Sequence, residues 1–377
     1  MTYLIPRIKP IYPLYRLNSN VFRIGAQIGI TTEIEDEEDQ FWTLANLLNG
    51  KNHLDDIASG MREKYPELTN QDILDGITIL NDEGVVEESF PDKTTNDRYI
   101  PNINYFSRFI DAHGDRFQVQ KKISDTRIIL LGLGGGGSNI LALLAGLGPK
   151  SITIVDYDRV EAGNLGRQFL YREGDIGKKK VAVAKNAVEK MNSEIEIKAF
   201  DKKIVTVEDV LELLNDVDIV VCAIDEPPFI IHRIVNEAIV KAKIPCVFGA
   251  SQVSRGRVYT VLPGVTGCFD CLNIQFSKND PKFIEQFVGF RNIHFAPPSI
   301  AYGPGIFQLV AGIVDELVRV ITNYAPPRSL GTQYEINYED GSSFCHPSWP
   351  RFAAECPTCG EGHYDDWEIF QYYELQE

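Results

Sequence analysis

The distribution of hydrophobic and polar residues divides the chain into two regions. Residues 11–90 begin with short stretches of alternating hydrophobic and polar residues, and three segments with helical spacing follow. From Arg127 onward, short hydrophobic runs of strand length alternate with longer segments of helical spacing. The first pattern predicts a small α+β domain. The second predicts an α/β fold with a Rossmann-like, mostly parallel sheet that has helices on both faces.

The N-terminal pattern resembles a winged helix-turn-helix. Strands are expected within 12–25 and 26–35, and a last strand within 84–89. Cap residues mark three helices. These helices are 36–50, capped by Asp36 or Asp39 and ended by Gly50; 53–65, preceded by Asn52; and 69–84, begun by Thr69 with Asp72 and ended by Gly84.

The second region is predicted to alternate strands and helices along the chain. Residues 91–103 are polar, contain two prolines and have no periodicity, which is typical of a linker. We therefore expect a winged-helix domain at 1–95, a connecting segment at 96–120 and an α/β domain at 121–377. The predicted strands and helices alternate over 127–134, 138–148, 151–158, 177–192, 196–204, 207–216, 218–225, 230–243 and 244–251.

Composition and charge exclude several classes of protein. Of the 377 residues, 44% are hydrophobic, which argues against disorder throughout, and the net charge of −16 disfavours nucleic acid and anionic membranes as partners. Residues 1–95 carry eight Lys or Arg and seventeen Asp or Glu, so peptide binding suits this domain better than DNA binding. Residues 128–148 are uncharged but contain four consecutive glycines, so a strand, turn and helix explain them better than a membrane span. The N-terminus lacks the uninterrupted hydrophobic core of a signal peptide, and we expect a cytoplasmic protein.

A glycine-rich turn indicates a nucleotide site. Gly132, Gly134 and Gly137 form G-x-G-x-x-G directly after a hydrophobic strand and before a helix, a context in which backbone N–H groups approach a phosphate. Asp156 ends the next strand, where it can hold a ribose hydroxyl. A glycine turn used only for packing is the alternative. These features by themselves do not distinguish a dinucleotide from ATP.

The residues after Asp156 favour ATP. Asn164, Arg167, Gln168 and Lys180 supply a cluster of phosphate-binding groups that a dehydrogenase would not need. The segments GLGGGGS, DYDRVEAGNLGRQ, IGKKK and CAID occur in this order. With this order and spacing, the chain resembles the E1-like, ThiF-type adenylating family, which includes ubiquitin-activating enzymes and bacterial relatives in thiamin and molybdopterin biosynthesis.

The resemblance implies a role for each matching residue. Arg108 lies in the segment 105–109, which resembles the family's arginine-bearing segment and would enter the site of the neighbouring subunit in a homodimer. Gln168 could instead order its loop, Lys178 or Lys179 could replace Lys180, and Glu226 follows Asp225 where the family usually has Asn. The implied nucleotide-site residues are Gly132, Gly134, Gly135, Gly137, Asp156 and Asp158, then Asn164, Arg167, Gln168 and Lys180 at the triphosphate, and Asp225 at Mg²⁺; the implied catalytic residues are Arg108, Arg167, Lys180 and Asp225.

The family's chemistry agrees with these residue types. A carboxylate attacks the α-phosphorus of ATP, pyrophosphate leaves, and an acyl adenylate forms. The nucleophile is already ionised at pH 7, so no general base is needed. Arg, Lys and Mg²⁺ are suited to align the two anions and to neutralise charge on the phosphoryl oxygens.

Seven cysteines suggest a metal site. Cys268 with Cys271 and Cys356 with Cys359 form two Cys-x-x-Cys pairs, a spacing that fits a Cys₄ zinc site, and the resemblance implies the same structural Zn²⁺. Four thiols without a metal are the alternative. Two of the remaining cysteines, at 222 and 246, lie in hydrophobic strand segments and are expected to pack in the core.

The remaining cysteine, Cys345, is a weak candidate for a nucleophile. The chain has no cysteine between Leu272 and Phe344. The resemblance implies that family members forming a thioester place the reactive cysteine in this part of the chain or in a dedicated later domain. We therefore expect the adenylate to react without an enzyme thioester.

The N-terminal domain narrows the functional hypothesis. An adenylating domain with an acidic N-terminal winged helix resembles enzymes that modify ribosomally made precursor peptides, such as the microcin- and pantocin-maturing enzymes. We expect ATP-dependent adenylation of a peptide carboxylate in peptide-antibiotic biosynthesis, with a glutamate side chain and pantocin-type cyclisation as the best guess. The expected partners are a precursor peptide with its leader and a second copy of the chain. The alternatives are an activating enzyme for a ubiquitin-like sulfur carrier and a non-catalytic leader-binding scaffold.

Overall fold

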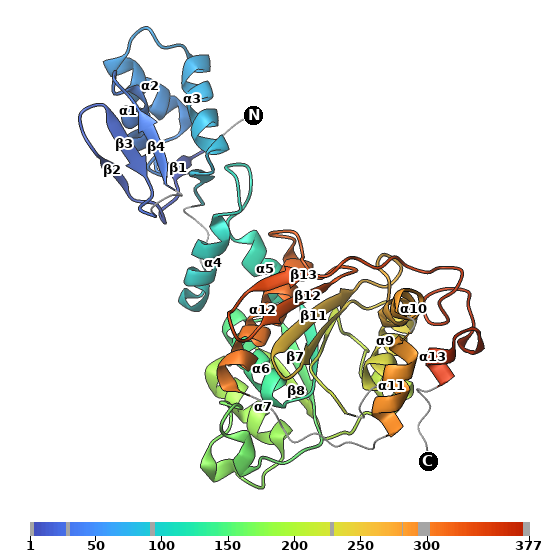
Figure 1. Cartoon of the computed structure of the whole chain (residues 1–377). Coiled ribbons are helices and arrows are strands. Elements are labelled where there is room, and N and C mark those ends of the chain that lie inside the picture. Colours follow the sequence, from blue (N-terminus) through green and yellow to red (C-terminus); the bar gives the residue numbers. More distant parts are fainter. Residues whose placement is uncertain are drawn as a thin grey trace. The chain divides into compact units, whose positions relative to one another are not determined.

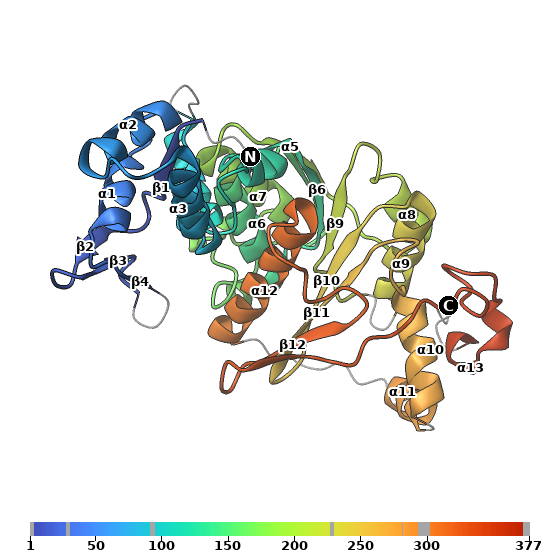
Figure 2. The ribbon, with the colours of Figure 1, turned by 90° about the horizontal axis from the view of Figure 1, so that it is seen from above.

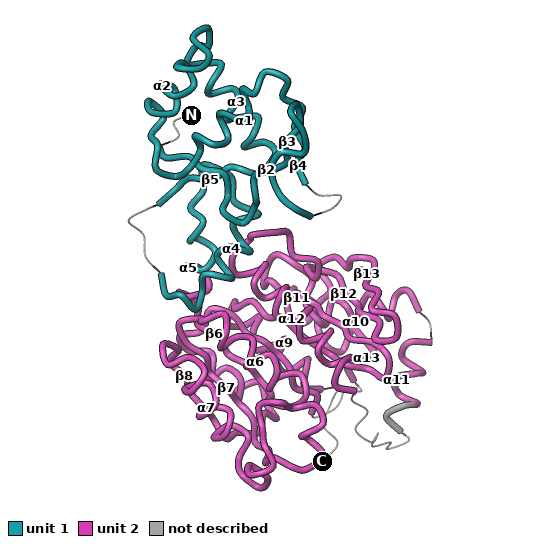
Figure 3. The backbone as a smooth tube through the Cα atoms, turned by 90° about the vertical axis from the view of Figure 1, so that its left-hand side faces the viewer, with its two compact units in different colours: residues 1–122 teal, residues 123–377 magenta. Residues whose placement is uncertain are grey.

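The computed structural model describes residues 4–27, 31–90, 95–226, 230–280, 282–292 and 302–371. The chain forms two compact units, Met1–Lys122 and Ile123–Glu377 (Figure 3). Each unit is described by itself below. No helix within the described ranges combines the length and hydrophobicity that a membrane span requires.

Unit 1 combines short strands with three consecutive helices. Strand β1 (Pro6–Ile8) pairs antiparallel with β5 (Val86–Glu88), and a separate antiparallel sheet has the order β2-β3-β4 (Figure 1). The remaining elements are β2 (Leu14–Arg16), β3 (Val21–Ile24), β4 (Thr32–Glu35), α1 (Gln40–Leu47), α2 (Leu54–Lys64), α3 (Asn70–Asp82), a 3₁₀ turn at Asp97–Tyr99, α4 (Ile100–Ser107) and α5 (Gln118–Asp125), which crosses the boundary to unit 2.

The caps of these helices agree in part with the sequence predictions. The side chain of Asp36 accepts a hydrogen bond from the Trp42 amide (2.7 Å), whereas Asp39 stands at the N-cap in a left-handed conformation without a side-chain bond. Asn52 is not the cap of α2; His53 occupies that position. Thr69 and Asp72 form the expected capping box of α3.

A buried ion-pair network joins the segment after residue 96 to strands β1 and β5 of unit 1. Arg116 donates to the carboxylate of Glu87 (2.6 Å), which Arg7 also contacts (2.7 Å). Glu87 is buried, so its charge requires these partners. The network therefore holds Arg116 within unit 1.

Unit 2 is built on an eight-stranded sheet. Its order is β13-β12-β11-β10-β9-β6-β7-β8, and the five strands from β10 to β8 are parallel (Figure 1). The expected mostly parallel sheet is confirmed, whereas the antiparallel strands β11, β12 and β13 were not predicted. The strands are β6 (Arg127–Leu131), β7 (Ser151–Val155), β8 (Glu196–Phe200), β9 (Ile219–Cys222), β10 (Cys246–Ser251), β11 (Arg255–Val261), β12 (Gln333–Asn337) and β13 (Ser343–Cys345).

Helices cover both faces of this sheet, as expected. Helices α6, α7 and α12 lie on one face, and α8 and α9 lie on the other (Figure 2). Helix α12 is largely buried, although Phe307 is exposed on it. The helices are α6 (Gly135–Leu147), α7 (Lys180–Met191), α8 (Val207–Leu211), α9 (Ile231–Ala242), α10 (Phe269–Asn279), α11 (Phe283–Asn292), α12 (Gly303–Thr322) and α13 (Glu368–Gln371), with 3₁₀ turns at Ala162–Asn164, Glu173–Asp175 and Tyr364–Asp366.

The order of the parallel strands determines where a ligand site can form. Strand β6 lies between β7 and β9, so the chain continues to one side of β6 first and reaches the other side later. In open parallel sheets, ligands bind at the carboxyl ends of the strands where the strand order reverses. The crevice between the ends of β6 and β9 is therefore the expected position of the site.

Candidate nucleotide site and cysteine cluster

The glycine turn joins β6 closely to α6. Gly132 has φ +92°, and a side chain there would come within 2.6 Å of the carbonyl oxygen of Ala223. A side chain at Gly137 would collide with the carbonyl oxygen of Gly132, whereas Gly134 faces open space. Only glycine therefore fits at positions 132 and 137. The turn thus exposes the N-terminus of α6, where the first backbone N–H groups have no intrahelical partners.

Asp156 holds the turn in place. One of its carboxylate oxygens accepts from the backbone N–H of Leu133 and the other from that of Asp158, both at 2.7 Å. Burial raises the pKa of Asp156 above the usual value for an aspartate. The residue expected at the ribose therefore also connects the end of β7 to the glycine turn.

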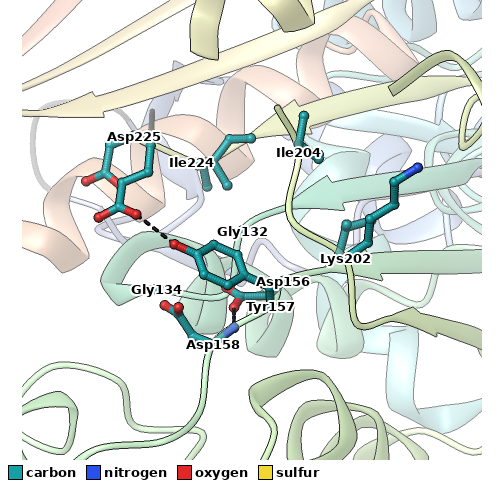
Figure 4. A pocket seen from close by; sticks show the side chains of 12 residues that line it. Gly132, Gly134, Asp156, Tyr157, Asp158, Lys202, Ile204, Ile224 and Asp225 are labelled. Atoms are coloured by element: carbon teal, nitrogen blue, oxygen red, sulfur yellow. Dashed lines mark hydrogen bonds between the residues drawn. The ribbon is translucent and has the colours of Figure 1, made fainter. Parts of the chain in front are cut away.

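A pocket lies at these strand ends (Figure 4). Of the predicted residues, Gly132, Gly134, Asp156, Asp158 and Asp225 line it. The sequence analysis did not assign Tyr157, Lys202, Ile204 or Ile224 to the site, although their positions just after strands β7, β8 and β9 could have indicated them. The complete lining comprises Gly132, Gly134, Val155, Asp156, Tyr157, Asp158, Lys202, Ile204, Ala223, Ile224, Asp225 and Glu226.

Glu226 connects the two sides of this pocket. The hydroxyl group of Tyr157 donates a hydrogen bond to the carboxylate of Glu226 at 2.8 Å. This bond, together with desolvation, raises the pKa of Tyr157, which therefore stays protonated. The residue that replaces the Asn usual in the family thus contacts a pocket residue directly.

Among three consecutive lysines, Lys180 is the one that contacts a predicted site residue. Its amine lies 2.7 Å from the carboxylate of Asp158, and its side chain is only 6% exposed. Lys178 pairs with Asp175 at 2.9 Å, and Lys179 with Asp201 at 2.9 Å. Lys179 also donates to the backbone carbonyl of Tyr157 at 2.8 Å. Lys202 is the lysine that lines the pocket, whereas Lys180 is the one of the three consecutive lysines whose amine pairs with a carboxylate of the lining.

The loop after β7 brings Arg167 to the start of α6. The aliphatic part of its side chain would lie 3.4 Å from a β-carbon at Gly135, and the carbonyl group of Arg167 accepts from Asn139 of α6 (2.7 Å). Asn164 accepts from the backbone N–H of Glu161 (2.9 Å), so in this structure its side chain caps a 3₁₀ turn. The buried side-chain oxygen of Gln168 has no hydrogen-bond partner among the described residues.

The last two predicted residues have different surroundings. Asp225 follows the end of β9 and is exposed, and partial desolvation by the surrounding pocket raises its pKa. Arg108 lies in unit 1, where its guanidinium carbon is 5.6 Å from the ring centres of Tyr105 and Phe109. The role of Arg108 at a site in unit 2 stays a prediction.

The donors around the pocket fit a nucleoside triphosphate. The N-terminus of α6 offers backbone N–H groups and positive dipole charge, and open space at Gly134 allows a phosphate to approach. Arg167 supplies a positive side chain beside Gly135 at this helix end, and Lys180 supplies one beside Asp158 of the pocket lining. Asp156 is a possible acceptor for ribose hydroxyls. The expected Mg²⁺ would have the carboxylate of Asp225 as a ligand.

The four paired cysteines come together in the core of unit 2. Their sulfur atoms all lie within 4.8 Å of one another, and the separations include 3.9 Å for Cys268–Cys271, 3.6 Å for Cys268–Cys356 and 3.4 Å for Cys271–Cys359. A tetrahedral zinc ion with Zn–S bonds of about 2.3 Å requires sulfurs about 3.8 Å apart. The four sulfurs therefore fit one Zn²⁺.

The surroundings of the cluster also suit a metal. All four cysteines are buried, and the backbone N–H of Phe352 donates to the sulfur of Cys271 at 3.4 Å. Burial raises the pKa of Cys268, so a group of thiolates in this position requires a cation to compensate their charge. Because all four positions of a tetrahedron would be protein ligands, the expected role of the ion is structural.

The three other cysteines lie outside this cluster. Cys222 and Cys246 are fully buried, which confirms the predicted core packing. Cys345 is exposed on β13, and its thiol donates to the carbonyl group of Arg328 at 3.5 Å. The ring of His346 hydrogen-bonds Glu335 at 2.9 Å.

The fold and the pocket define an α/β nucleotide-binding protein, and sequence comparison identifies its family. Residues 100–358, more than half of the chain, match the ThiF family. The chain therefore belongs to the ThiF family, and by class it is an ATP-dependent adenylyltransferase.

Two curated bacterial proteins illustrate this relationship. The sulfur carrier protein ThiS adenylyltransferase of Bacillus subtilis is 39% identical over 155 residues, which are 41% of this chain and 45% of that protein. The sulfur carrier protein adenylyltransferase of Thermus thermophilus is 29% identical over 252 residues, covering 64% of this chain and 85% of that protein. The chain thus spans less than half of the first relative's length.

Solved structures are similar over a longer part of the chain. The crystal structure of Escherichia coli MccB with ATP matches with a TM-score of 0.75 and 22% identity, covering 94% of this chain and 99% of that one. A structure of the microcin C7 biosynthetic enzyme MccB in complex with N-formylated MccA gives the same values. At this identity, the similarity shows a shared fold.

Proposed function

We propose that this enzyme adenylates a carboxylate of a ribosomally made precursor peptide. The observation that carries the proposal is the extent of the similarity to MccB. It covers 94% of the chain, whereas the ThiF match begins at residue 100, so the similarity to MccB also includes most of unit 1. MccB has been crystallised in complexes with MccA. A peptide substrate would explain why an adenylating unit is joined to a second unit.

The proposed reaction follows from the groups at the pocket. A carboxylate oxygen of the peptide forms a bond to the α-phosphorus of ATP, the bond from this phosphorus to the bridging oxygen breaks, and pyrophosphate leaves with the electron pair. No proton is transferred, because the attacking carboxylate is ionised at neutral pH. The reaction instead needs two anions to be brought together, which is achieved by positioning and by neutralising charge.

Residues of unit 2 are proposed to supply both the positioning of the substrates and the neutralisation of the phosphate charge. The N–H groups at the start of α6, with Arg167 and Lys180, would neutralise the phosphates, and Asp156 would fix the ribose. Lys180 is paired with Asp158 in the structure, so binding of a triphosphate would draw its amine toward the phosphates and weaken this pair. Mg²⁺ bound by Asp225 would supply further positive charge at the reacting phosphate.

Unit 1 is proposed to bind the leader of the precursor. In the three-stranded sheet, β2 and β4 are edge strands, and an extended peptide could add to the exposed edge within residues 13–35 while α2 forms the other wall of the groove. The acidic charge of this unit favours a leader with basic residues or one that binds through hydrophobic contacts. We retain the winged-helix assignment and the boundaries 1–95, 96–120 and 121–377 as part of this proposal.

Three finer assignments complete the proposal. The activated group is a glutamate side chain, leading to cyclisation, which rests on the resemblance to the pantocin-maturing enzymes. The Cys₄ cluster holds one structural Zn²⁺. The enzyme is a homodimer in which Arg108 reaches the partner's site. Mixing an Arg108→Ala subunit with an Asp225→Ala subunit should then restore activity. If the subunits are shown to exchange and no activity returns, the role of Arg108 in the partner's site is wrong.

Peptide-dependent release of pyrophosphate tests the proposed reaction. Wild-type enzyme with ATP and the peptide encoded beside its gene should release pyrophosphate and change the mass of the peptide. Lys180→Ala and Asp225→Ala should reduce this release to background while the protein stays folded. Wild-type turnover by either variant would show that the assigned residues are wrong.

A truncated chain tests the role of unit 1. A chain that begins at Ile123 contains the whole described pocket and should still bind ATP, but it should process the full precursor poorly. Arg108→Ala in the full chain is the matched control, because truncation also removes this residue. If truncation leaves processing unchanged, or if isolated unit 1 prefers duplex DNA to the leader, the leader-binding role is wrong.

A second candidate function is activation of a ubiquitin-like sulfur carrier. It is favoured by the 39% identity to the ThiS adenylyltransferase of Bacillus subtilis. In this case the substrate would be a Gly-Gly terminal carboxylate, and pyrophosphate release would require the carrier protein rather than a precursor peptide. A non-catalytic scaffold, the third hypothesis, would bind a leader and release no pyrophosphate with either substrate.

A further inference from the structure

The two Cys-x-x-Cys segments contact each other through residues that lie between their cysteines. Asp270 belongs to the first cysteine segment, Cys268–Cys271, and Thr358 belongs to the second, Cys356–Cys359. The hydroxyl group of Thr358 donates a hydrogen bond to the Oδ2 atom of Asp270 at 2.5 Å. The two segments are thus joined by their own side chains, although Asp270 and Thr358 are 88 residues apart in the sequence.

The carboxylate of Asp270 is buried and has a cationic partner. Its side chain is only 1% exposed. Arg233 of α9 donates from Nε to the Oδ1 atom of Asp270 at 2.9 Å and from Nη2 to the Oδ2 atom at 3.3 Å. A buried carboxylate requires a partner of opposite charge, so Arg233 and Asp270 act as one unit, to which Thr358 is bonded.

The C-terminal part of the chain holds Arg233 from another side. The guanidinium carbon of Arg233 lies 4.7 Å from the ring centre of Phe370 and 5.1 Å from that of Tyr364. The hydroxyl group of Tyr364 donates to Glu237 of α9 at 3.3 Å, and it lies 3.2 Å from the hydroxyl oxygen of Thr358. These cation–π contacts and hydrogen bonds connect α9, α10 and the C-terminal segment.

A second side chain of α9 holds the start of the first cysteine segment. The Oδ1 atom of Asn236 accepts from the backbone N–H of Phe269 at 2.9 Å, and Asn236 is fully buried. Phe269 directly follows Cys268, at the beginning of α10. Asn236 and Arg233 are three positions apart on α9, so they contact this segment from the same side of the helix.

An exposed ion pair also joins α10 to the C-terminal segment. The amine of Lys278 lies 2.8 Å from the carboxylate of Glu355, the residue before Cys356. The two side chains are 37% and 44% exposed, and exposed pairs of this kind contribute little to stability. The chain therefore contains an exposed link with which the buried one can be compared.

We infer that Asp270 is a positioning residue of the cysteine cluster. Through Thr358 it holds the second cysteine segment against the first, and through Arg233 it fixes both segments to α9, so that the four sulfurs stay within reach of one ion. Residues that orient metal ligands typically change metal affinity by about 10- to 100-fold. The inference rests on the proposed Zn²⁺ in this cluster and is independent of which carboxylate the enzyme adenylates.

Four variants of the full chain test this role. Asp270→Asn keeps the size of the side chain and removes its charge. Thr358→Val removes the hydroxyl group and keeps the shape, whereas Thr358→Ser keeps the hydroxyl group. Glu355→Gln is the matched control, because it makes the same change of charge in the exposed pair with Lys278.

Competition with a chelator of known affinity measures the dissociation constant for Zn²⁺. Asp270→Asn should bind Zn²⁺ about 10- to 100-fold more weakly than the wild type, and Thr358→Val about 10-fold more weakly. Thr358→Ser and Glu355→Gln should stay within about twofold of the wild type. Wild-type affinity in Asp270→Asn or Thr358→Val would overturn the inference, and so would equal losses in Thr358→Val and Thr358→Ser or in Asp270→Asn and Glu355→Gln.

Replacement of Zn²⁺ by Co²⁺ gives a second measurement, which reports the arrangement of the sulfurs rather than the stability of the protein. Four thiolates in a tetrahedron produce characteristic visible absorption bands of Co²⁺. At saturating Co²⁺, Thr358→Ser and Glu355→Gln should show the wild-type bands, whereas Asp270→Asn should show weaker or shifted bands. Wild-type bands in Asp270→Asn would mean that Asp270 does not position the ligands.

The wild-type protein separates failure of the inference from failure of the assignments on which it rests. If the wild type binds neither Zn²⁺ nor Co²⁺, the metal assignment is wrong and the inference fails with it. If the wild type binds Zn²⁺ and all four variants bind it equally well, the metal assignment stands and the role of Asp270 is wrong. Peptide-dependent release of pyrophosphate tests the proposed reaction separately from both.

Discussion

The nucleotide pocket and the cysteine cluster lie in the same unit, but their charged groups differ in solvent exposure and in the partners that balance their charge. Among the pocket residues, Asp158 keeps 45% of its side chain exposed, and it pairs with Lys180. The four cysteines are buried, and their sulfurs are brought together from segments more than 80 residues apart. A site for a transient ligand keeps its polar groups accessible and partly paired, whereas a structural centre excludes water and depends on its ion for charge balance.

This difference predicts opposite consequences of substitution. Removing a pocket charge should slow the reaction without unfolding the protein, because the remaining groups are solvated or have other partners. Removing a ligand of a buried ion should unfold the region that the ion connects, because the other thiolates lose their counter-charge. The predictions below test this contrast in order of decreasing effect.

Replacing a cysteine of the cluster should have the largest effect. Cys356→Ser should remove stoichiometric zinc and lower the free energy of unfolding by about 5 kcal/mol or more, since structural zinc contributes directly to folding. Metal analysis and denaturant unfolding measure the two effects. Cys345→Ser is the control, because Cys345 is exposed and outside the cluster. Full zinc occupancy in Cys356→Ser would contradict the prediction.

Replacing Lys180, which pairs with Asp158 of the pocket, should affect the rate of the reaction rather than the stability of the protein. Lys180→Met keeps the aliphatic packing of a side chain that is 6% exposed, and it should reduce pyrophosphate release by about 1,000-fold, equivalent to about 4 kcal/mol of transition-state stabilisation. The free energy of unfolding should change by about 1 kcal/mol or less. Lys178→Met, which breaks only an exposed pair with Asp175, should stay close to wild type. If both variants lose the same amount of rate, the assignment of the phosphate-binding role to Lys180 rather than Lys178 is wrong.

Acidification should destabilise the protein through His232 of helix α9. The pKa of His232 is lowered from 6.5 to about 4, so between these values the unfolded chain binds a proton that the folded protein excludes. The contribution of His232 to stability is thus fully present above pH 6.5 and is lost as the pH falls toward 4. His232→Gln should lose about 2 kcal/mol less than wild type between pH 7 and pH 4.5.

Urea unfolding of both proteins at the two pH values measures this difference. The raised pKa values of Asp156 and Asp225 also make the stability depend on pH, but these contributions are common to both proteins and cancel in the comparison. Parallel losses in the two proteins would mean that His232 is protonated in the folded state.

Glu226 should give the smallest effect. Its carboxylate is exposed and accepts a hydrogen bond from Tyr157 at the pocket, so Glu226→Gln should change the free energy of unfolding by less than about 0.5 kcal/mol. The KM for ATP should change by less than about fivefold, and Tyr157→Phe should have an effect of the same size if the hydrogen bond is responsible. A loss of turnover as large as that of Lys180→Met would show that Glu226 belongs to the catalytic groups.

Local chemistry explains which elements the sequence predicted well. The capping box of Thr69 and Asp72 and the glycine turn at Gly132 involve residues a few positions apart, so their geometry depends on nearby backbone. Local sequence could not decide whether Asp36 or Asp39 caps the first helix. Both can cap a helix, and the chain path that directs Asp36 toward the Trp42 amide is set by the packing of the whole unit.

The sequence alone determined the alternation of strands and helices, the glycine turn and the two Cys-x-x-Cys pairs, because periodicity, backbone conformation and ligand spacing are local properties. The tertiary structure decided which of three lysines faces Asp158, which strands extend the sheet beyond β10 and which residues line the pocket beside those of the motifs. It also brought together the sulfurs of cysteines that are 88 residues apart in the sequence. These features arise between distant segments, and no short-range pattern encodes a contact that exists only after the sheet and its helices have packed.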